Sequence, residues 1–167
     1  EFTKAPPSMT PYPTLVAAQL EQSYGSKVTL RNRAVGGWSS GQGVADLDNL
    51  LKEKPDLVII AYGMNDVGGR NPEAFQANIA TMLQRTREAN PSIEVVLVAT
   101  MTGNPDWVAT PAEMFPKYRA ALASLQGPGV VLADLTSAWL RLLERKRHTD
   151  LTGNGVNHPN DCGHRVY

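Results

Sequence analysis

Three apolar runs of strand length constrain the fold of this chain more than any other feature of its sequence. They are DLVIIAY at Asp56–Tyr62, IEVVLVA at Ile93–Ala99 and GVVLA at Gly129–Ala133. Their apolar residues are continuous, so each run is expected to be covered on both faces, as the strands of a parallel sheet are. Segments with helical spacing separate the runs. This alternation predicts an α/β fold built on a doubly wound parallel sheet.

The remaining elements follow from spacing and from breaker residues. Lys27–Asn32 alternates Val28 and Leu30 with polar neighbours, which predicts a further strand. Pro116 is expected to kink the helix that contains it, and Arg165–Tyr167 is expected to be the first turn of a final helix. Helices are predicted over Pro13–Tyr24, Val44–Lys54, Pro72–Ala89, Pro111–Leu125, and from Asp134 or Thr136 to Arg147.

Composition excludes several classes of function. The 167 residues carry 16 basic and 16 acidic side chains, so the balanced charge offers no long-range attraction for nucleic acid or an anionic membrane. No apolar run approaches 18 residues, so no membrane span is expected. Cys162 is the one cysteine, which rules out an intrachain disulfide. We therefore expect no nucleic-acid partner and no membrane span.

Ligands of such sheets bind at the carboxyl ends of the strands, so the loops there are the ones to search. Gly36-Gly37 follows the first predicted strand and could present backbone N–H groups to an anion. Gly63-Met64-Asn65-Asp66 follows the most apolar strand. A glycine N–H and the Asn65 amide together would make an oxyanion hole. Asp66 could act as a base, but an aspartate there more often braces its own loop.

The third loop contains His158, followed by Pro159-Asn160. No helical or strand periodicity surrounds this histidine, which favours a chemical role over packing. His158, Asp161 and His164 cluster in sequence, but their spacing fits no standard zinc site. We expect no metal site and no cofactor.

Together these motifs resemble the SGNH (GDSL-type) hydrolase family, over essentially the whole chain. Gly36-Gly37 is similar to the second family block, Gly63–Asp66 to the GxND block and His158-Pro159-Asn160 to the HPN block. The resemblance implies a flavodoxin-like three-layer α/β/α sandwich with a parallel sheet. It also implies that Gly37 and Asn65 are oxyanion donors and that His158 is the catalytic base.

The chain departs from the family pattern at two points. The family's nucleophilic serine lies in a GDS motif after the first strand, and no GDS occurs here. That strand would lie between the second and third strands of the sheet. We therefore expect residues 1–167 to be a single SGNH-hydrolase-like domain and a fragment of it, lacking the first strand and the last helix. Ser39 and Ser40 are weak candidates for the nucleophile, which is not identified in this chain.

The second departure concerns the acid that orients the histidine. The family usually has aspartate three residues before it, where this chain has Gly155. Asp150 could reach back if the Gly153–Gly155 turn folds under it, and it is the preferred candidate. Asp134 is an alternative. A dyad in which the histidine donates to a backbone carbonyl is another.

The function expected of the intact protein is that of a serine esterase acting on acyl or acetyl esters. The alternatives are a non-catalytic module that binds a small ligand or carbohydrate, and a phosphate-binding flavodoxin-like domain. Trp38, Ser39 and Trp107 stand in or near the crevice loops and are the expected substrate-binding residues. A small acyl group such as acetate is preferred. The sequence does not predict oligomeric state or localisation.

Overall fold

The computed structural model describes residues 9–167, which fall into two compact units. Of these residues, the first unit contains 9–37 with Lys146–Tyr167, and the second contains Trp38–Arg145. None of the helices formed by the described residues has the length and apolar character needed to cross a membrane.

The second unit contains the sheet. Its strands are β1 (Leu57–Ile60), β2 (Glu94–Ala99) and β3 (Val130–Asp134), in that order across the sheet. Both pairings are parallel, so the carboxyl ends of the three strands share one edge. The three apolar runs of the sequence therefore form strands as predicted, each shifted or shortened by a few residues.

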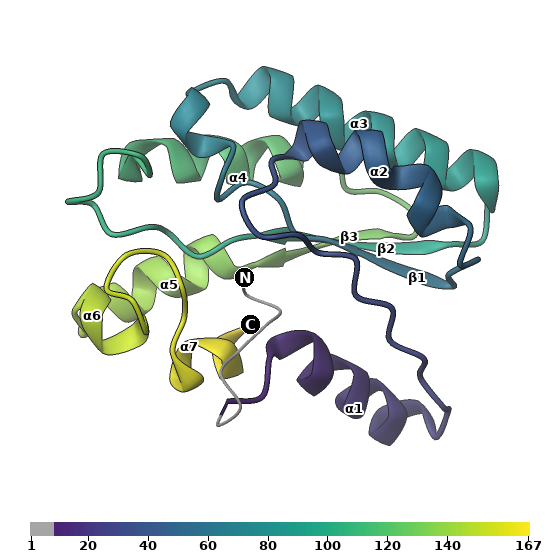
Figure 1. Ribbon diagram of the computed structural model, residues 1–167, viewed down its shortest axis with the longest axis horizontal. Helices are drawn as coiled ribbons and strands as arrows, with labels where there is room; N and C mark the ends of the chain where they lie inside the picture. Colours follow the sequence, from purple (N-terminus) through teal and green to yellow (C-terminus); the bar gives the residue numbers. More distant parts are fainter. Residues whose placement is uncertain (1–8) are drawn as a thin grey trace. The chain divides into compact units, whose positions relative to one another are not determined.

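Helices cover both faces of this sheet. Figure 1 shows α3 (Pro72–Ala89) and α4 (Phe115–Ala123) over one face and α5 (Leu135–Leu143) over the other. Trp139 of α5, Phe75 and Ile79 of α3 and Leu97 of β2 are almost completely buried in the core. The expected α/β class and three-layer arrangement are confirmed. The remaining elements of this unit are α2 (Ser40–Leu51), η1 (Val67–Gly69) and η2 (Ala112–Met114).

Capping residues explain where several helix bounds differ from the expected ones. Helix α2 begins at Ser40, four residues before Val44, because Ser39 and Gln42 form a capping box at its start. Pro116 lies in the first turn of α4, where its missing N–H costs nothing, and the predicted helix is divided just before it into η2 and α4. Helix α5 follows the N-cap Asp134 and ends at Leu143, four residues before the expected Arg147.

One close contact joins α2 to the end of β1. A side chain at Gly43 would place its Cβ 2.4 Å from the ring of Tyr62. No carbon atom can come that close without displacing its neighbour, so the glycine makes room for the tyrosine. Glycine inside a helix costs about 0.5–1 kcal/mol relative to alanine. The Tyr62 contact explains why this helix contains it.

The first unit is helical. It comprises α1 (Tyr12–Tyr24), α6 (His148–Leu151) and α7 (Asp161–Val166). Helix α1 confirms the prediction and ends at Gly25, whose φ of 62° lies in the left-handed region. Helix α7 begins earlier than expected because Asn160 caps it. The rings of Tyr12 and Tyr167 lie 5.1 Å apart and join α1 to the end of the chain.

The strand expected over Lys27–Asn32 is wrong. These residues have no regular structure, and Leu30 is 42% exposed. A strand needs a neighbour to satisfy its backbone N–H and C=O groups. Within residues 9–167 no strand pairs with this segment, so its alternating pattern has no sheet to join.

Candidate functional site

The loop after β1 presents Asn65. Gly63 has a φ of 127°, and its carbonyl oxygen accepts hydrogen bonds from Asp66 N at 3.1 Å and Val67 N at 2.9 Å. This tight turn leaves Asn65 exposed at the carboxyl edge of the sheet. The Nδ2 of Asn65 donates to the carbonyl oxygen of Trp38 at 2.9 Å. That contact fixes the plane of the amide.

Asp66 braces the same loop from within. Its carboxylate accepts from Gly63 N at 3.1 Å, from Ser40 N at 2.9 and 3.1 Å, and from Ser40 Oγ at 2.5 Å. Ser40 Oγ in turn accepts from Nδ2 of Asn78 at 2.9 Å. The loop after β1, the start of α2 and the helix α3 are therefore tied together. The expectation that Asp66 braces its loop is confirmed.

A tyrosine holds the loop from the side of α4. The Tyr118 hydroxyl donates to the carbonyl oxygen of Asp66 at 2.9 Å and accepts from Asn71 N at 3.0 Å. Burial raises the pKa of the Tyr118 phenol, so the hydroxyl keeps its proton and remains a donor near neutral pH. Together the carboxylate and the phenol make this loop a rigid support for Asn65.

Gly37 is the last residue of the N-terminal segment of the first unit. Its φ of 81° lies in the left-handed region that favours glycine, and open space lies where a Cβ would be. The two residues that follow have structural contacts of their own. Trp38 is half-buried, and Ser39 donates through its N–H (2.7 Å) and its hydroxyl (2.8 Å) to Oε1 of Gln42.

The His158 loop is organised by an asparagine. Oδ1 of Asn154 accepts from the backbone N–H groups of Val156, Asn157 and His158, each at 3.0 Å. The carbonyl oxygen of His158 accepts from Gly153 N at 2.8 Å. These bonds fix the backbone on both sides of the histidine, whose side chain is half-buried.

Gly155 occupies the position where the family usually has the orienting aspartate. Its φ is 70°, and no atom lies within 4 Å of the place a Cβ would take. The backbone conformation, and not the space, therefore disfavours a side chain there. The aspartate is absent at a point where the turn itself favours glycine.

Asp150 has other partners. Its Oδ2 accepts from Arg147 N at 2.9 Å and its Oδ1 from Arg147 Nη2 at 3.0 Å, which caps the first turn of α6. The Arg147 side chain lowers the pKa of the Asp150 carboxyl. The segments on either side of the Gly153–Gly155 turn are joined by two backbone hydrogen bonds. Gly153 N donates to the carbonyl oxygen of His158, and Asn160 N donates to that of Leu151. The orienting role of Asp150 stays a prediction, and these contacts favour capping.

Asp134, the other candidate acid, is also engaged within its own unit. Its Oδ1 accepts from Ser137 N at 3.0 Å, which caps α5, and its Oδ2 accepts from Nε and Nη2 of Arg119 at 2.9 and 2.8 Å. Burial alone would raise the pKa of this carboxyl, but the hydrogen bonds from Arg119 and Ser137 lower it overall. Asp134 therefore has a complete structural role.

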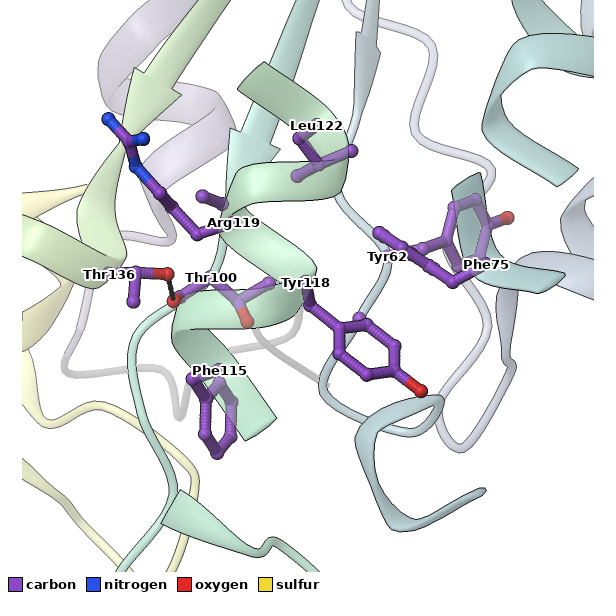
Figure 2. A pocket seen from close by; sticks show the side chains of 10 residues that line it. Tyr62, Phe75, Thr100, Phe115, Tyr118, Arg119, Leu122 and Thr136 are labelled. Carbon is purple, nitrogen blue, oxygen red and sulfur yellow. Dashed lines mark hydrogen bonds between the residues drawn. The ribbon is translucent and has the colours of Figure 1, made fainter. Parts of the chain in front are cut away.

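The pocket in Figure 2 lies beneath α4, and none of the residues that line it is a predicted site residue. Aromatic side chains of Phe75, Phe115 and Tyr118 line it, and the Thr136 hydroxyl donates to the carbonyl oxygen of Thr100 at 2.6 Å. Its volume of about 10 Å³ is at the lower limit for a single water molecule. It is a packing gap between helix and sheet and too small for a substrate.

Sequence reasoning missed three residues that support the site. Ser40, a nucleophile candidate by sequence, is fully buried and hydrogen-bonded to Asp66 and Asn78. Asn78 lies in the middle of α3, where no local signal marks it. The signal for Asn154 was present, because an asparagine between two glycines is typical of a turn closed by its own side chain.

A family model and a curated relative both match this chain. The model of the GDSL-like lipase/acylhydrolase family matches residues 4–166. An arylesterase from Vibrio mimicus is 29% identical over 89 residues, which are 52% of this chain and 44% of the relative. The chain thus matches less than half the length of this curated relative.

Solved structures share the fold. A lipase from a goat rumen metagenome superposes with a TM-score of 0.79 at 17% identity, covering 97% of this chain and 86% of that one. A catalytic mutant of an acetylxylan esterase from Geobacillus stearothermophilus has a TM-score of 0.77 at 19% identity, covering 93% and 76%. At these identities the likeness shows the fold alone.

Proposed function

Because this chain belongs to the GDSL-like lipase/acylhydrolase family, we propose that the natural protein is a serine esterase that hydrolyses small acyl esters. The observation that carries the proposal is the loop around Asn65. An exposed amide is held there by Trp38 and by a fully bonded aspartate, Asp66. Such rigidity is what stabilisation of a transient oxyanion requires.

Asn65 and Gly37 are the proposed oxyanion donors. An amide nitrogen carries two N–H groups, and Trp38 accepts from Asn65 Nδ2 at 2.9 Å. The second N–H is assigned to the oxygen of the tetrahedral intermediate. Gly37 contributes its backbone N–H, and its left-handed conformation and open surroundings support that role.

His158 is the proposed general base. It takes the proton from a serine hydroxyl as the serine oxygen attacks the ester carbonyl, and an oxyanion forms on the carbonyl oxygen. The C–O bond to the alcohol then breaks, and His158 gives its proton to the departing alcohol. Water hydrolyses the acyl-enzyme by the same route. The hydrogen bond from His158 N to Asn154 supports a fixed position for the base.

A histidine base also needs an orienting group. Asp150 is the predicted acid, but its two contacts with Arg147 favour capping of α6. We therefore propose a Ser-His dyad, in which backbone carbonyls orient the imidazole. Asn154 supports this arrangement because it already fixes the backbone of the histidine loop.

The nucleophile is proposed to be a serine other than Ser39 and Ser40. Ser40 is fully buried, and its hydroxyl donates to Asp66 while accepting from Asn78. The Ser39 hydroxyl donates to Gln42 at the start of α2. A hydroxyl committed to such a contact has no proton to pass to a base without breaking the local structure.

The proposed substrate class is small acyl esters, with acetyl esters preferred. Trp38, Ser39 and Trp107 are the proposed substrate-binding residues. Two relatives are named as an acetylxylan esterase and an arylesterase, and both names describe enzymes that act on esters. Their names support esters as the substrate class. An assay with acetate esters of both carbohydrates and aryl alcohols would decide which alcohol part is preferred.

The test is hydrolysis of p-nitrophenyl acetate by the natural protein, with and without a serine-directed organophosphorus reagent. We expect turnover that the reagent abolishes, with one serine labelled in the mass spectrum. We also expect the label on a serine other than Ser39 or Ser40. Binding of the ester without release of nitrophenol would instead establish the rival function, a non-catalytic small-ligand module.

A further inference from the structure

The loop between β2 and α4 carries two adjacent apolar side chains that face water. Val108 is 93% exposed and Trp107 is 48% exposed. Single exposed apolar residues are normal on protein surfaces, but neighbouring ones often mark a binding site. Asp106 is the only ionisable residue from Met101 to Thr110, so the loop tip is mainly apolar. Figure 1 shows this segment extending away from the sheet.

The loop is fixed by its own hydrogen bonds. Trp107 N donates to the carbonyl oxygen of Asn104 at 2.9 Å, and Asp106 N donates to Oδ1 of the same asparagine at 3.0 Å. Thr110 N donates to the carbonyl oxygen of Trp107 at 3.0 Å. At the base, a Cβ on Gly103 would lie 2.3 Å from Oγ1 of Thr110, so the two arms of the loop meet there. Exposure of the tip is therefore built into an ordered turn.

This loop also adjoins the one that carries Asn65. A Cβ on Gly68 would lie 2.8 Å from the carbonyl oxygen of Ala109, so the two loops are in direct backbone contact. An ion pair between Arg70 and Glu113, at 2.6 Å, joins the flanking segments. Asn65 is three residues from Gly68, and Trp107 is two residues from Ala109. The base of the apolar loop thus contacts the turn that follows the proposed oxyanion donor.

We infer that Trp107 and Val108 form an apolar subsite for a hydrocarbon group of the ester substrate. The inference rests on the proposed function and deepens it, because it names the kind of ester preferred. A ring and a branched aliphatic side chain favour an alkyl or aryl group. A sugar would need polar partners beside the ring. The hydrocarbon can belong to the acyl part or to the alcohol part, since both surround the same ester bond.

The experiment measures kcat/KM of the natural protein for two series of esters. The acyl series is p-nitrophenyl acetate, butyrate and hexanoate. The alcohol series is ethyl, butyl and phenyl acetate. The variants are Trp107→Ala, Val108→Ser and their combination. Leu140→Ser is the matched control, because it removes another apolar side chain, 43% exposed, from α5.

The preference is the ratio of kcat/KM for the largest ester to kcat/KM for the smallest ester of a series. We expect this ratio to fall on the order of tenfold in the double variant, in at least one series. The loss for the largest ester should exceed the loss for the smallest. Loss in the alcohol series assigns the subsite to the alcohol. Loss in the acyl series assigns it to the acyl chain and overturns the proposed preference for acetyl esters. Leu140→Ser should leave both preferences unchanged.

Three outcomes contradict the inference. Unchanged preferences in an active double variant overturn the subsite and leave the esterase function standing. An equal loss for every ester also overturns it, because the loop would then only support the site. Absence of hydrolysis by the wild type overturns the esterase function and the subsite with it. The Val108→Ser variant keeps the test valid if Trp107→Ala fails to fold, since Val108 is almost fully exposed.

Discussion

The buried hydroxyl of Ser40 and the carboxylate of Asp66 are joined by a hydrogen bond of 2.5 Å across 26 residues of sequence. The bond ties the first residue of α2 to the loop after β1. Asp66 also accepts from Ser40 N and from Gly63 N, so its two oxygens serve three donors. This carboxylate is the centre of the structure that supports Asn65.

Asp66→Asn should therefore destabilise the chain by about 2–3 kcal/mol. The amide nitrogen would replace a carboxylate oxygen and cannot accept that oxygen's hydrogen bonds, so buried donors would lose their acceptor. Urea unfolding of the 167-residue chain measures this loss. Asp48→Asn is the control: its ion pair with Arg85 is exposed on the aspartate side, so the loss should stay below about 1 kcal/mol. Equal losses for the two variants would contradict the assigned role of Asp66.

Asn65→Ala should lower kcat of the natural protein by about 10²–10³, the usual cost of one oxyanion donor. Its free energy of unfolding should change by less than about 0.5 kcal/mol, because Asn65 is exposed. Steady-state kinetics and urea unfolding measure the two effects. Asn49→Ala, at an exposed position of α2, should change neither quantity. Near-normal turnover by Asn65→Ala would refute its assignment.

Asn154→Ala should lower kcat by about 10², because the backbone around His158 loses three hydrogen bonds and the base is no longer held in place. KM should change little. Asn154→Asp keeps an oxygen in the same position and should restore most of the activity. Failure of this rescue, or normal turnover by Asn154→Ala, would show that the loop does not depend on Asn154.

Asp150→Asn separates orientation of His158 from capping of α6. From its contacts with Arg147 we expect kcat to fall less than about threefold, far below the roughly 10⁴ that loss of an orienting aspartate causes. Arg147→Ala removes one of the same contacts and should cost little stability, because the Arg147 side chain is 84% exposed. A loss of kcat near 10⁴ for Asp150→Asn alone would establish Asp150 as the orienting acid.

Stability should fall as the pH drops below about 6.5. Burial lowers the pKa of both His148 and His164 below the ordinary value of 6.5. Above pH 6.5 these residues are neutral in both states. Below it the unfolded chain binds protons that the folded chain does not, so folding becomes less favourable.

Thermal unfolding between pH 8 and pH 5 measures this effect, and His164→Gln should flatten the dependence. The carboxyls of Asp134 and Asp150 have lowered pKa values in the folded chain. The stability that they contribute is lost only as the pH falls below about 3.8, so the histidine and carboxyl effects occupy separate pH ranges. An unchanged slope in His164→Gln would mean that the acid sensitivity resides elsewhere.

Local patterns predicted the elements that are stabilised by the core of their own unit. Continuous apolar runs became β1, β2 and β3, and the helix over Pro72–Ala89 has the predicted bounds. Lys27–Asn32 shows why the same reasoning fails elsewhere. Its alternation is a strand pattern, but pairing is a property of two segments, and the sheet of the described residues does not include this one.

The candidate site was predictable where a single loop contains the signal. The Gly63–Asp66 loop and the bracing role of Asp66 followed from residue types in short spacing. The contacts of Asp66 with Ser40 and of Ser40 with Asn78 bridge 26 and 38 residues, and no local pattern encodes them. Asp150 shows a third limit, because its competing partner Arg147 is three residues away and equally able to bind it.

The contact between Gly43 and Tyr62 has a consequence for how sequences of this kind can diverge. A Cβ at position 43 would meet the tyrosine ring at 2.4 Å, so alanine there requires a smaller residue at position 62. Neither change is favourable alone, because one clashes and the other opens a void. The two positions should therefore change together in evolution. Moving the large side chain from one position to the other in two separate steps would pass through a poorly folded intermediate.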